Sequence, residues 1–454
     1  MHIILNILAF LFAIFLLVMT HECGHFFVAR LFKVKILKFS IGFGKAIFRW
    51  KGKNGMEYVL AWLPLGGYVK MLDTREMTVA KKDLHLALDK KPFLQKMLIV
   101  LAGPLTNIII GLLAFWLMFA IGIKAPKPII GAIQPNSIAS SSELKAGDII
   151  VAVDGNQAAN WQEVMLPLFS HLGNYDKVNL TIYRAKDGSQ KDYVLDLSHW
   201  QLNTTTFDLL NGLGIDAYQP EAPTIIGSIQ KDTPAANSDL KANDKIISID
   251  DHVVNNWNDL VSYLHDNPNK LLHIKVLRDK KLHEIDVVSD WRFGSNWKKI
   301  GFLGITPVNI DWPEGTLQEE HYSAFGALQA SYIQTYKFIE FNGIALKKLI
   351  TRKIPMSVLG GPISVFQSSS AALNHGLVVY VGFLAIFSVM LAFVNLIPIP
   401  GLDGGHILIF LLEGIFRRPI PIAVQILLFR LGLIFLILLA VQATFNDLTR
   451  IFTS

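Results

Sequence analysis

The first apolar run of the chain ends in the stretch His21-Glu22-Cys23-Gly24-His25. Residues 3–19 are almost wholly apolar, so two histidines and a glutamate follow directly within a helix that is predicted to be membrane-embedded. Positions i and i+4 of a helix share one face, so His21 and His25 can present two imidazoles to one metal ion while Glu22 lies beside them. Ionisable groups inside a membrane are expensive and are usually functional. The H-E-x-x-H spacing therefore predicts a zinc hydrolase site at the inner end of a transmembrane helix.

Composition and charge also indicate a membrane protein. The chain of 454 residues is 52% hydrophobic and 17% charged, with a mean hydropathy of +0.39, which exceeds ordinary soluble domains. Residues 29–96 carry 15 Lys and Arg against 5 Asp and Glu, whereas residues 124–320 carry 18 against 26. Membrane topology explains this split better than a nucleic-acid-binding face, so no nucleic-acid partner is expected. Cys23 is the single cysteine, which excludes an internal disulfide.

Four apolar segments predict a multi-spanning α-helical membrane protein with four transmembrane helices. The predicted spans are 1–27, 95–123, 376–396 and 422–443. The first lacks the basic start and cleavage site of a signal peptide, so we expect it to be retained. Basic residues follow the first span and precede the fourth, which places both flanks in the cytoplasm by the positive-inside rule. Residues 322–353 are a candidate interfacial amphipathic helix, with an ordinary packing helix as the alternative.

The second span contains residues that are unusual at membrane depth. Gly103-Pro104 predict a kink or a close packing of helices, and Asn107 is a polar group that needs a partner. We expect Asn107 to join helices rather than to take part in chemistry.

Residues 28–94 are predicted to form a membrane-associated β region on the cytoplasmic side. Alternating apolar residues and glycines between 36 and 72, including Ile41-Gly42-Phe43-Gly44, indicate short strands and tight turns. An exposed edge of such a sheet can receive an extended peptide by strand addition. An ordinary cytoplasmic hairpin is the alternative.

The acidic region contains an internal repeat at a constant offset of 96 residues. Leu144-Lys145-Ala146-Gly147-Asp148 returns as Leu240-Lys241-Ala242-Asn243-Asp244. The exchange of glycine for asparagine fits a left-handed turn, which both residues tolerate. Two small tandem α+β domains are therefore predicted, at 127–220 and 221–310. Their order of elements resembles the permuted PDZ domains of bacterial membrane proteases, and this resemblance implies the capture of a peptide terminus.

The third span runs into Asn395-Leu396-Ile397-Pro398-Ile399-Pro400-Gly401-Leu402-Asp403-Gly404-Gly405-His406, and a loop is predicted at 395–406. Catalytic zinc typically has three protein ligands and one open position. Asp403 is the best candidate for the third ligand, and His406 and His375 are weaker alternatives. Asn395 is expected to hold the substrate backbone or polarise the scissile carbonyl, with capping of the loop as its alternative. Zinc would lower the pKa of water towards about 7, and Glu22 would act as the general base.

Taken together, these motifs resemble the site-2 protease family of intramembrane zinc metalloproteases, in particular its bacterial sigma-E group. H-E-x-x-H on the first span, Asn395-x-x-Pro398 running into Leu402-Asp403-Gly404 on the third, and the tandem PDZ-like repeats carry the resemblance over nearly the whole chain. The fold class that follows is a four-span helical membrane protein with a membrane-associated β element and two tandem PDZ-like α+β domains.

The resemblance implies Zn²⁺ on His21, His25 and Asp403, with Glu22 as catalytic acid and base, and substrate contact at Gly42-Phe43-Gly44. It also implies single-span membrane protein substrates, namely an anti-sigma factor after site-1 cleavage and remnant signal peptides. The PDZ pair would then exclude substrates with bulky external domains. The implied location is the bacterial inner membrane, in contact with lipid, with both termini and the PDZ domains in the periplasm and the active site towards the cytoplasm. No oligomeric state is predicted.

Two other classes stand as alternatives. A membrane zincin of the CaaX or heat-shock type takes its later ligand from a helical glutamate, and no such acidic motif stands out in this sequence. A non-catalytic membrane scaffold with PDZ domains would carry a degenerate metal site, whereas the motif set here is intact.

Overall fold

The computed structural model describes residues 2–52, 55–75, 77–174, 176–200, 208–294 and 298–453. Small parts of the predicted ranges 28–94, 127–220 and 221–310 lie outside these residues. The chain divides into two units: the first consists of the residues before 124 together with 319–447, and the second is built mainly from residues 124–318. The strands β3 (Ile123–Pro126) and β18 (Leu317–Glu320) lie where the chain passes between the units.

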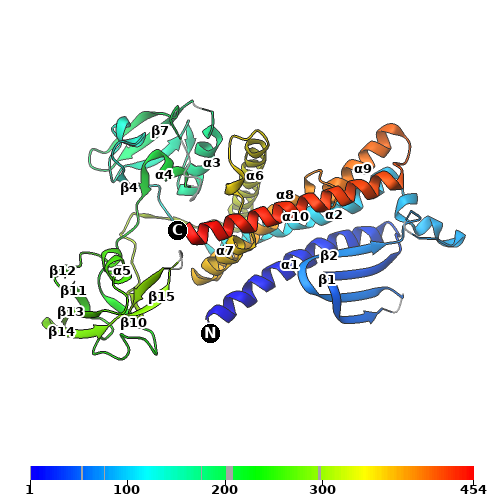
Figure 1. Cartoon of the computed structure of the whole chain (residues 1–454). Coiled ribbons are helices and arrows are strands. Elements are labelled where there is room, and N and C mark those ends of the chain that lie inside the picture. Colours follow the sequence, from blue (N-terminus) through cyan, green and yellow to red (C-terminus); the bar gives the residue numbers. More distant parts are fainter. Residues whose placement is uncertain are drawn as a thin grey trace. The chain divides into compact units, whose positions relative to one another are not determined.

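Four helices in the described part of the chain are long and apolar enough to cross a membrane (Figure 1). They are α1 (His2–Leu31), α2 (Phe93–Ile121), α8 (Leu377–Leu396) and α10 (Ile422–Thr453). The outer two extend beyond the predicted 1–27 and 422–443, because helical hydrogen bonding continues through polar end residues such as Arg30 and Arg450. The chain is therefore a multi-spanning helical membrane protein.

Helices α1 and α2 approach each other at two glycines. A Cβ atom on Gly24 would lie 2.4 Å from the carbonyl oxygen of Ala102, and a Cβ atom on Gly103 would lie 2.3 Å from His25 Nε2. Neither distance leaves room for a side chain. The close packing predicted at Gly103 is therefore the contact that brings α2 against the H-E-x-x-H face of α1.

Helix α6 (Ala324–Ile350) packs against α2 and α8. A shared apolar cluster joins the three helices, and its buried members are Phe115, Phe119, Ala327, Ala385 and Val389. The segment predicted as amphipathic at 322–353 thus buries its face of small residues on other helices. This contact favours the packing-helix alternative over a helix that lies in the lipid interface.

The β region forms two continuous antiparallel strands, β1 (Ile36–Lys51) and β2 (Glu57–Met71), beside α1 (Figure 1). Each strand pairs in two halves with interrupted register. Residues 38–41 pair with 57–60 on one side, and residues 36–41 pair with 67–71 on the other. Residues 46–51 also pair with 57–61. Gly42 and Gly44 have φ of 87° and 89°, which let β1 bend between its halves. The predicted short strands are thus joined through glycines, and 67–71 lies at a sheet edge.

Shorter helices connect these elements. They are η1 (Lys81–Leu86), η2 (Leu88–Lys90), η4 (Met356–Val358), α7 (Pro362–Asn374) and α9 (Asp403–Phe416). The loop predicted at 395–406 is shorter in the structure, because Asn395 belongs to the last turn of α8 and Asp403 already begins α9. Pro398 and Pro400 lie in the gap, where neither can donate a backbone hydrogen bond.

The second unit contains two copies that share one order of main elements, namely a strand, a hairpin, a helix, a second hairpin and a closing strand. The first copy consists of β4 (Ile130–Ile133), η3 (Ala139–Ser142), β5 (Ile149–Val153), β6 (Asn156–Gln157), α3 (Trp161–His171), β7 (Lys177–Arg184), β8 (Ser189–Asp196), α4 (Leu209–Leu213) and β9 (Ile215–Ala217). The second consists of β10 (Ile226–Ile229), β11 (Lys245–Ile249), β12 (His252–Val253), α5 (Trp257–Asp266), β13 (Leu271–Arg278), β14 (Lys281–Val288), β15 (Asp290–Phe293), β16 (Lys299–Phe302) and β17 (Ile305–Pro307). Their sheets have the equivalent orders β6-β5-β7-β8 and β12-β11-β13-β14.

The repeated pentapeptide has the same structural role in both copies. Gly147 and Asn243 both have positive φ, 88° and 71°, as the exchange between them predicts. The aspartate that follows is buried and forms a two-pronged ion pair with the arginine at the end of a strand, Asp148 with Arg184 and Asp244 with Arg278. The repeated sequence therefore forms the same left-handed turn and the same buried ion pair in both copies.

Candidate active site

The two histidines of the H-E-x-x-H stretch meet the first residue of α9. His21 and His25 lie one helical turn apart on α1, are 7% and 8% exposed, and have their Nε2 atoms 3.2 Å apart. Asp403 Oδ2 lies 3.0 Å from His21 Nε2 and 3.4 Å from His25 Nε2. Residues from the two ends of the chain thus converge on one point, and Asp403 is where sequence reasoning expects the third ligand.

These three side chains fit a zinc ion. Their ligand atoms all lie within 4.8 Å of one another. Asp403 Oδ2 is buried and accepts no well-formed hydrogen bond from the described residues, so its charge is left for another partner. Two imidazole nitrogens and one carboxylate oxygen are a donor set that zinc prefers, and three protein ligands leave a position open for water.

The second nitrogen of each imidazole is held by α2. His25 Nδ1 lies 2.8 Å from the carbonyl oxygen of Ile99, and His21 Nδ1 lies 3.3 Å from the side-chain amide of Asn107. Such contacts fix the orientation of a histidine ligand. From the sequence we expect Asn107 only to join helices. The role of Ile99 could not be predicted, because every residue type has a backbone carbonyl.

A cavity of about 780 Å³ opens beside the histidines. Glu22 lines it together with His21, His25 and Asp403, and residues 67–71 of β2 line another side. The backbone of this edge segment touches the glutamate: a Cβ atom on Gly67 would lie 2.7 Å from Glu22 Cγ. The glutamate therefore lies between the histidines and a strand edge.

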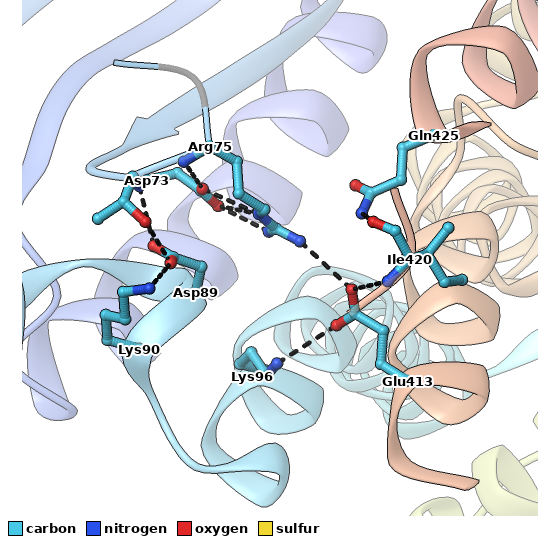
Figure 2. Close-up of polar contacts among 9 residues, drawn as sticks. Asp73, Arg75, Asp89, Lys90, Lys96, Glu413, Ile420 and Gln425 are labelled. Carbon is cyan, nitrogen blue, oxygen red and sulfur yellow. Dashed lines mark hydrogen bonds and ion pairs between the residues drawn. The ribbon is translucent and has the colours of Figure 1, made fainter. Parts of the chain in front are cut away.

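The rim of the cavity carries a network of ion pairs (Figure 2). Arg75 Nη2 donates to Asp73 at 2.7 Å, and its Nη1 lies 3.7 Å from Glu413 on α9. Glu413 also pairs with Lys96 of α2 at 3.5 Å and accepts a hydrogen bond from the Ile420 backbone at 3.2 Å. The hydrogen bonds to Asp73 raise the pKa of Arg75 further. The network joins the segment after β2 to α2, α9 and the start of α10, and it escaped prediction because its partners are far apart in sequence.

The other candidate residues lie away from the three converging ligand atoms. His406 lines the cavity, but its ring packs against Phe429 with centroids 4.8 Å apart, and burial lowers its pKa. His375 caps the end of α7 and is not among the residues that line the cavity. Asn395 is half-buried and does not line it either. The histidine alternatives for the third ligand are therefore further from the site than Asp403.

The Gly42-Phe43-Gly44 stretch approaches the cavity only indirectly. The ring of Phe43 stacks on Tyr68 with centroids 6.2 Å apart, and it is Tyr68 that lines the cavity. Residues 67–71 rather than 42–44 thus form the sheet border of the site. The sequence signal that could have pointed there is the Gly66-Gly67 pair, which permits close approach of a strand backbone.

Four membrane spans with a converging His-His-Asp set beside a buried glutamate define a membrane-embedded metalloprotease. The sequence profile of peptidase family M50 matches residues 9–439. A putative zinc metalloprotease of Vibrio cholerae is 35% identical over 447 residues, which is 98% of this chain and 99% of the relative. The regulator of sigma-E protease RseP of Escherichia coli is 36% identical over 446 residues, with the same coverage. The chain belongs to peptidase family M50 and is an intramembrane zinc metalloprotease.

One solved structure resembles part of the chain weakly. The PDZ domain of an SdrC-like protein from Listeria monocytogenes is 22% identical, covers 20% of this chain and 93% of that domain, and has a TM-score of 0.17.

Proposed function

We propose that this protein hydrolyses single-span membrane proteins next to the cytoplasmic face of a bacterial inner membrane. Its natural substrates are an anti-sigma factor that another protease has already cut, and remnant signal peptides. The observation that carries this proposal is the convergence of His21, His25 and Asp403 beside Glu22 in a cavity that a strand edge borders. The relatives named as sigma-E regulators support the choice of substrate.

In this proposal His21, His25 and Asp403 hold zinc. When bound, zinc supplies Lewis acidity, which activates water and polarises the scissile carbonyl. Glu22 takes a proton from the attacking water and delivers it to the leaving amide nitrogen, as a general base that becomes a general acid. The burial of His21, Glu22 and His25 keeps bulk water from competing for their hydrogen bonds.

The edge segment 67–71 holds the substrate as an added strand. A transmembrane helix hides its carbonyls in internal hydrogen bonds, so it must unwind before hydrolysis, and a strand edge supplies replacement partners. Among the described residues this segment pairs with β1 on one side only, and it lines the cavity next to Glu22. Asn395 and Gly42-Phe43-Gly44 act further from the cut, along the path of the unwound substrate.

The repeated domains of the second unit act as tandem PDZ domains that exclude substrates with bulky external parts. Their shared element order and equivalent sheets support a duplicated PDZ-like module. A chain without 127–310 should therefore cleave substrates that keep their external domains, which the full chain rejects. Equal rejection by the shortened chain would contradict the filter.

The proposed orientation places both termini and the repeats in the periplasm. The excess of basic residues in 29–96, and Arg417-Arg418 between α9 and α10, support a cytoplasmic location for these flanks. A cysteine introduced at Lys186 should react with a membrane-impermeant reagent added outside intact spheroplasts. A cysteine introduced at Lys81 should react only after lysis.

The test of the chemistry is Glu22→Gln. The variant should bind about one zinc per chain, because the three ligands are unchanged. It should not cleave a transmembrane segment whose external part has been shortened. Glu340→Gln on the exposed face of α6 is the matched control and should cleave normally. Normal cleavage by Glu22→Gln would refute the assigned mechanism.

A further inference from the structure

The two histidines share one requirement if their Nε2 atoms are to bind a metal. A neutral imidazole carries its proton on one nitrogen, so a lone pair at Nε2 requires the proton at Nδ1. For His25 this requirement is met by Ile99, whose carbonyl oxygen lies 2.8 Å from Nδ1. A carbonyl only accepts, so His25 must donate Nδ1–H to it.

The partner of His21 is an amide that can present either of its ends. As it stands in the structure, Asn107 places Nδ2 toward His21 Nδ1 at 3.3 Å and Oδ1 toward the Thr20 hydroxyl at 3.3 Å. The two ends of an amide have nearly the same shape, so hydrogen-bond partners decide which end is oxygen. Rotation of the amide by half a turn exchanges them without moving any other atom.

The hydroxyl of Thr20 permits the rotated setting that Nδ1–H on His21 requires. Its oxygen lies 3.1 Å from the carbonyl oxygen of Leu17, which can only accept. When the single hydroxyl proton goes to Leu17, the Thr20 oxygen accepts from the NH₂ group of the rotated Asn107 amide. The amide oxygen then faces His21 and accepts Nδ1–H. One chain of donors and acceptors thus runs from His21 through Asn107 and Thr20 to Leu17.

The packing of the two helices explains why these contacts occur together. Ile99, Gly103 and Asn107 follow one another at four-residue intervals on one face of α2, opposite His25 and His21 on α1. Gly103 allows the approach, since its Cβ would fall on the two imidazoles. Asn107 is fully buried, and its backbone carbonyl accepts a hydrogen bond from Ser388 of α8 at 2.7 Å.

We infer that Asn107 is a positioning residue that fixes His21 in the Nδ1–H tautomer, with its side-chain oxygen as acceptor. It does for His21 what the backbone of Ile99 does for His25. This inference rests on the proposed metal role of His21, His25 and Asp403. It makes a residue of the second span part of the site without making it a ligand.

The test is zinc affinity, measured by competition with a chelator on the purified full-length chain in detergent. Asn107→Leu removes the acceptor and should weaken zinc binding by about 10- to 100-fold. Asn107→Asp keeps an oxygen of the same geometry and should bind zinc as tightly as the natural chain or more tightly. A role in helix packing alone predicts the opposite for aspartate, because the carboxylate cannot replace the NH₂ donor to Thr20.

Two controls change the same helix contacts without touching His21. Ser388→Ala removes the hydrogen bond to the Asn107 backbone, and Thr106→Ala removes a hydroxyl that donates to the Ala102 carbonyl within α2. Both should bind zinc within about twofold of the natural chain, which is well below the loss expected when the partner of a histidine ligand is removed. A loss as large as that of Asn107→Leu in either control would overturn the inference.

The inference fails if Asn107→Leu binds zinc normally, or if the aspartate variant loses zinc as severely as the leucine variant. Should the leucine variant not fold, weakened binding in the aspartate variant alone overturns it. His21→Ala separates this failure from that of the proposed function. If His21→Ala keeps full zinc affinity, the proposed site itself is wrong; if it loses zinc while Asn107→Leu does not, only the role of Asn107 is wrong.

Discussion

Two aspartates of the first unit, the half-buried Asp403 and the buried Asp447, have opposite surroundings. Asp447 on α10 is 2% exposed and accepts hydrogen bonds from the backbone N–H groups of Gly361, Ile363 and Ser364 at 2.9–3.0 Å. The Ser364 hydroxyl donates to it as well. These donors are the N–H groups at the start of α7, which have no acceptor within the helix. A negative charge is favoured at such a helix start. Asp403 instead directs an oxygen without a well-formed hydrogen bond at two imidazoles.

The difference teaches that burial does not by itself identify a functional acid in a membrane protein. Both carboxylates lie in apolar helical surroundings, and both are costly unless their charge is matched. Protein donors match the charge of Asp447, so this residue holds α7 against α10. Asp403 has two histidine lone pairs nearby and needs a cation. The set of hydrogen bonds around each carboxylate separates the structural acid from the candidate ligand.

Asp403→Asn should produce the largest effect, because it removes the charge that zinc requires. Zinc content should fall well below one per chain, and cleavage should drop by about 10³-fold or more, since the metal contributes several kcal/mol to the transition state. Metal analysis and a cleavage assay would measure both. Asp447→Asn is the matched control, and we expect it to keep zinc and the rate per folded molecule. If Asp403→Asn kept its zinc, the proposed difference between Asp403 as a ligand and Asp447 as a structural acid would be wrong.

Gly103→Ala should damage the Asp403 site without altering a ligand. The new Cβ would lie 2.3 Å from His25 Nε2 and 2.9 Å from His21 Cε1, so one helix must shift. Overpacking of this kind costs about 1–3 kcal/mol, which corresponds to a loss of zinc affinity of about 5- to 150-fold. Gly343→Ala on α6 is the control, because nothing lies near its added methyl group. Normal zinc affinity in Gly103→Ala would show that α2 does not shape the site.

Asp447→Ala should lower stability rather than zinc affinity. It leaves the first amide groups of α7 without acceptors, and the loss of a helix cap with charged hydrogen bonds costs about 2 kcal/mol. Unfolding in mixed micelles with rising denaturing detergent would measure the change. A variant that unfolds normally but loses zinc would reverse the roles of the two aspartates.

Asp244 is another buried acid whose charge is matched by hydrogen bonds, and its ionisation should make stability depend on pH. Burial alone would raise its pKa, but hydrogen bonds from Arg278 and the Lys241 backbone outweigh that effect and hold the pKa below its ordinary value. Its contribution to stability is therefore complete above the ordinary pKa of about 4 and is lost as pH falls through the lower folded value. Hydrogen exchange of β11 and β13 in the full chain should accelerate a few-fold more in this range than for Asp244→Asn. Identical pH profiles would contradict the assignment.

Local pattern was enough for the helical part of the fold. The four spans follow from hydropathy, and the i and i+4 spacing by itself places His21 and His25 on one face of a helix. Asp403 could be chosen because a lone acid beside prolines and glycines at membrane depth is unusual. The left-handed turns at Gly147 and Asn243 also followed from residue type.

The parts that escaped prediction depend on contacts between distant segments. Residues 36–41 pair with two different parts of β2, which leaves 67–71 at an edge. Bends at glycines set this pairing, and the alternation of apolar and polar residues does not predict it. The partners of the imidazole Nδ1 atoms depend on how α1 crosses α2, which a single helix pattern cannot specify. Asp447 gives no local signal, since its donors lie on another helix.

The separation of Asp403 from the histidines along the chain bears on how the enzyme comes into being. A ribosome completes the H-E-x-x-H helix early, but Asp403 follows only after the second unit and the third span have been made. If Asp403 is the third ligand, as proposed, the partly synthesised chain has only two of the three ligands while it is inserted into the membrane. Cleavage would then require residue 403 to be in place, and a chain interrupted before it would be inactive towards neighbouring nascent proteins.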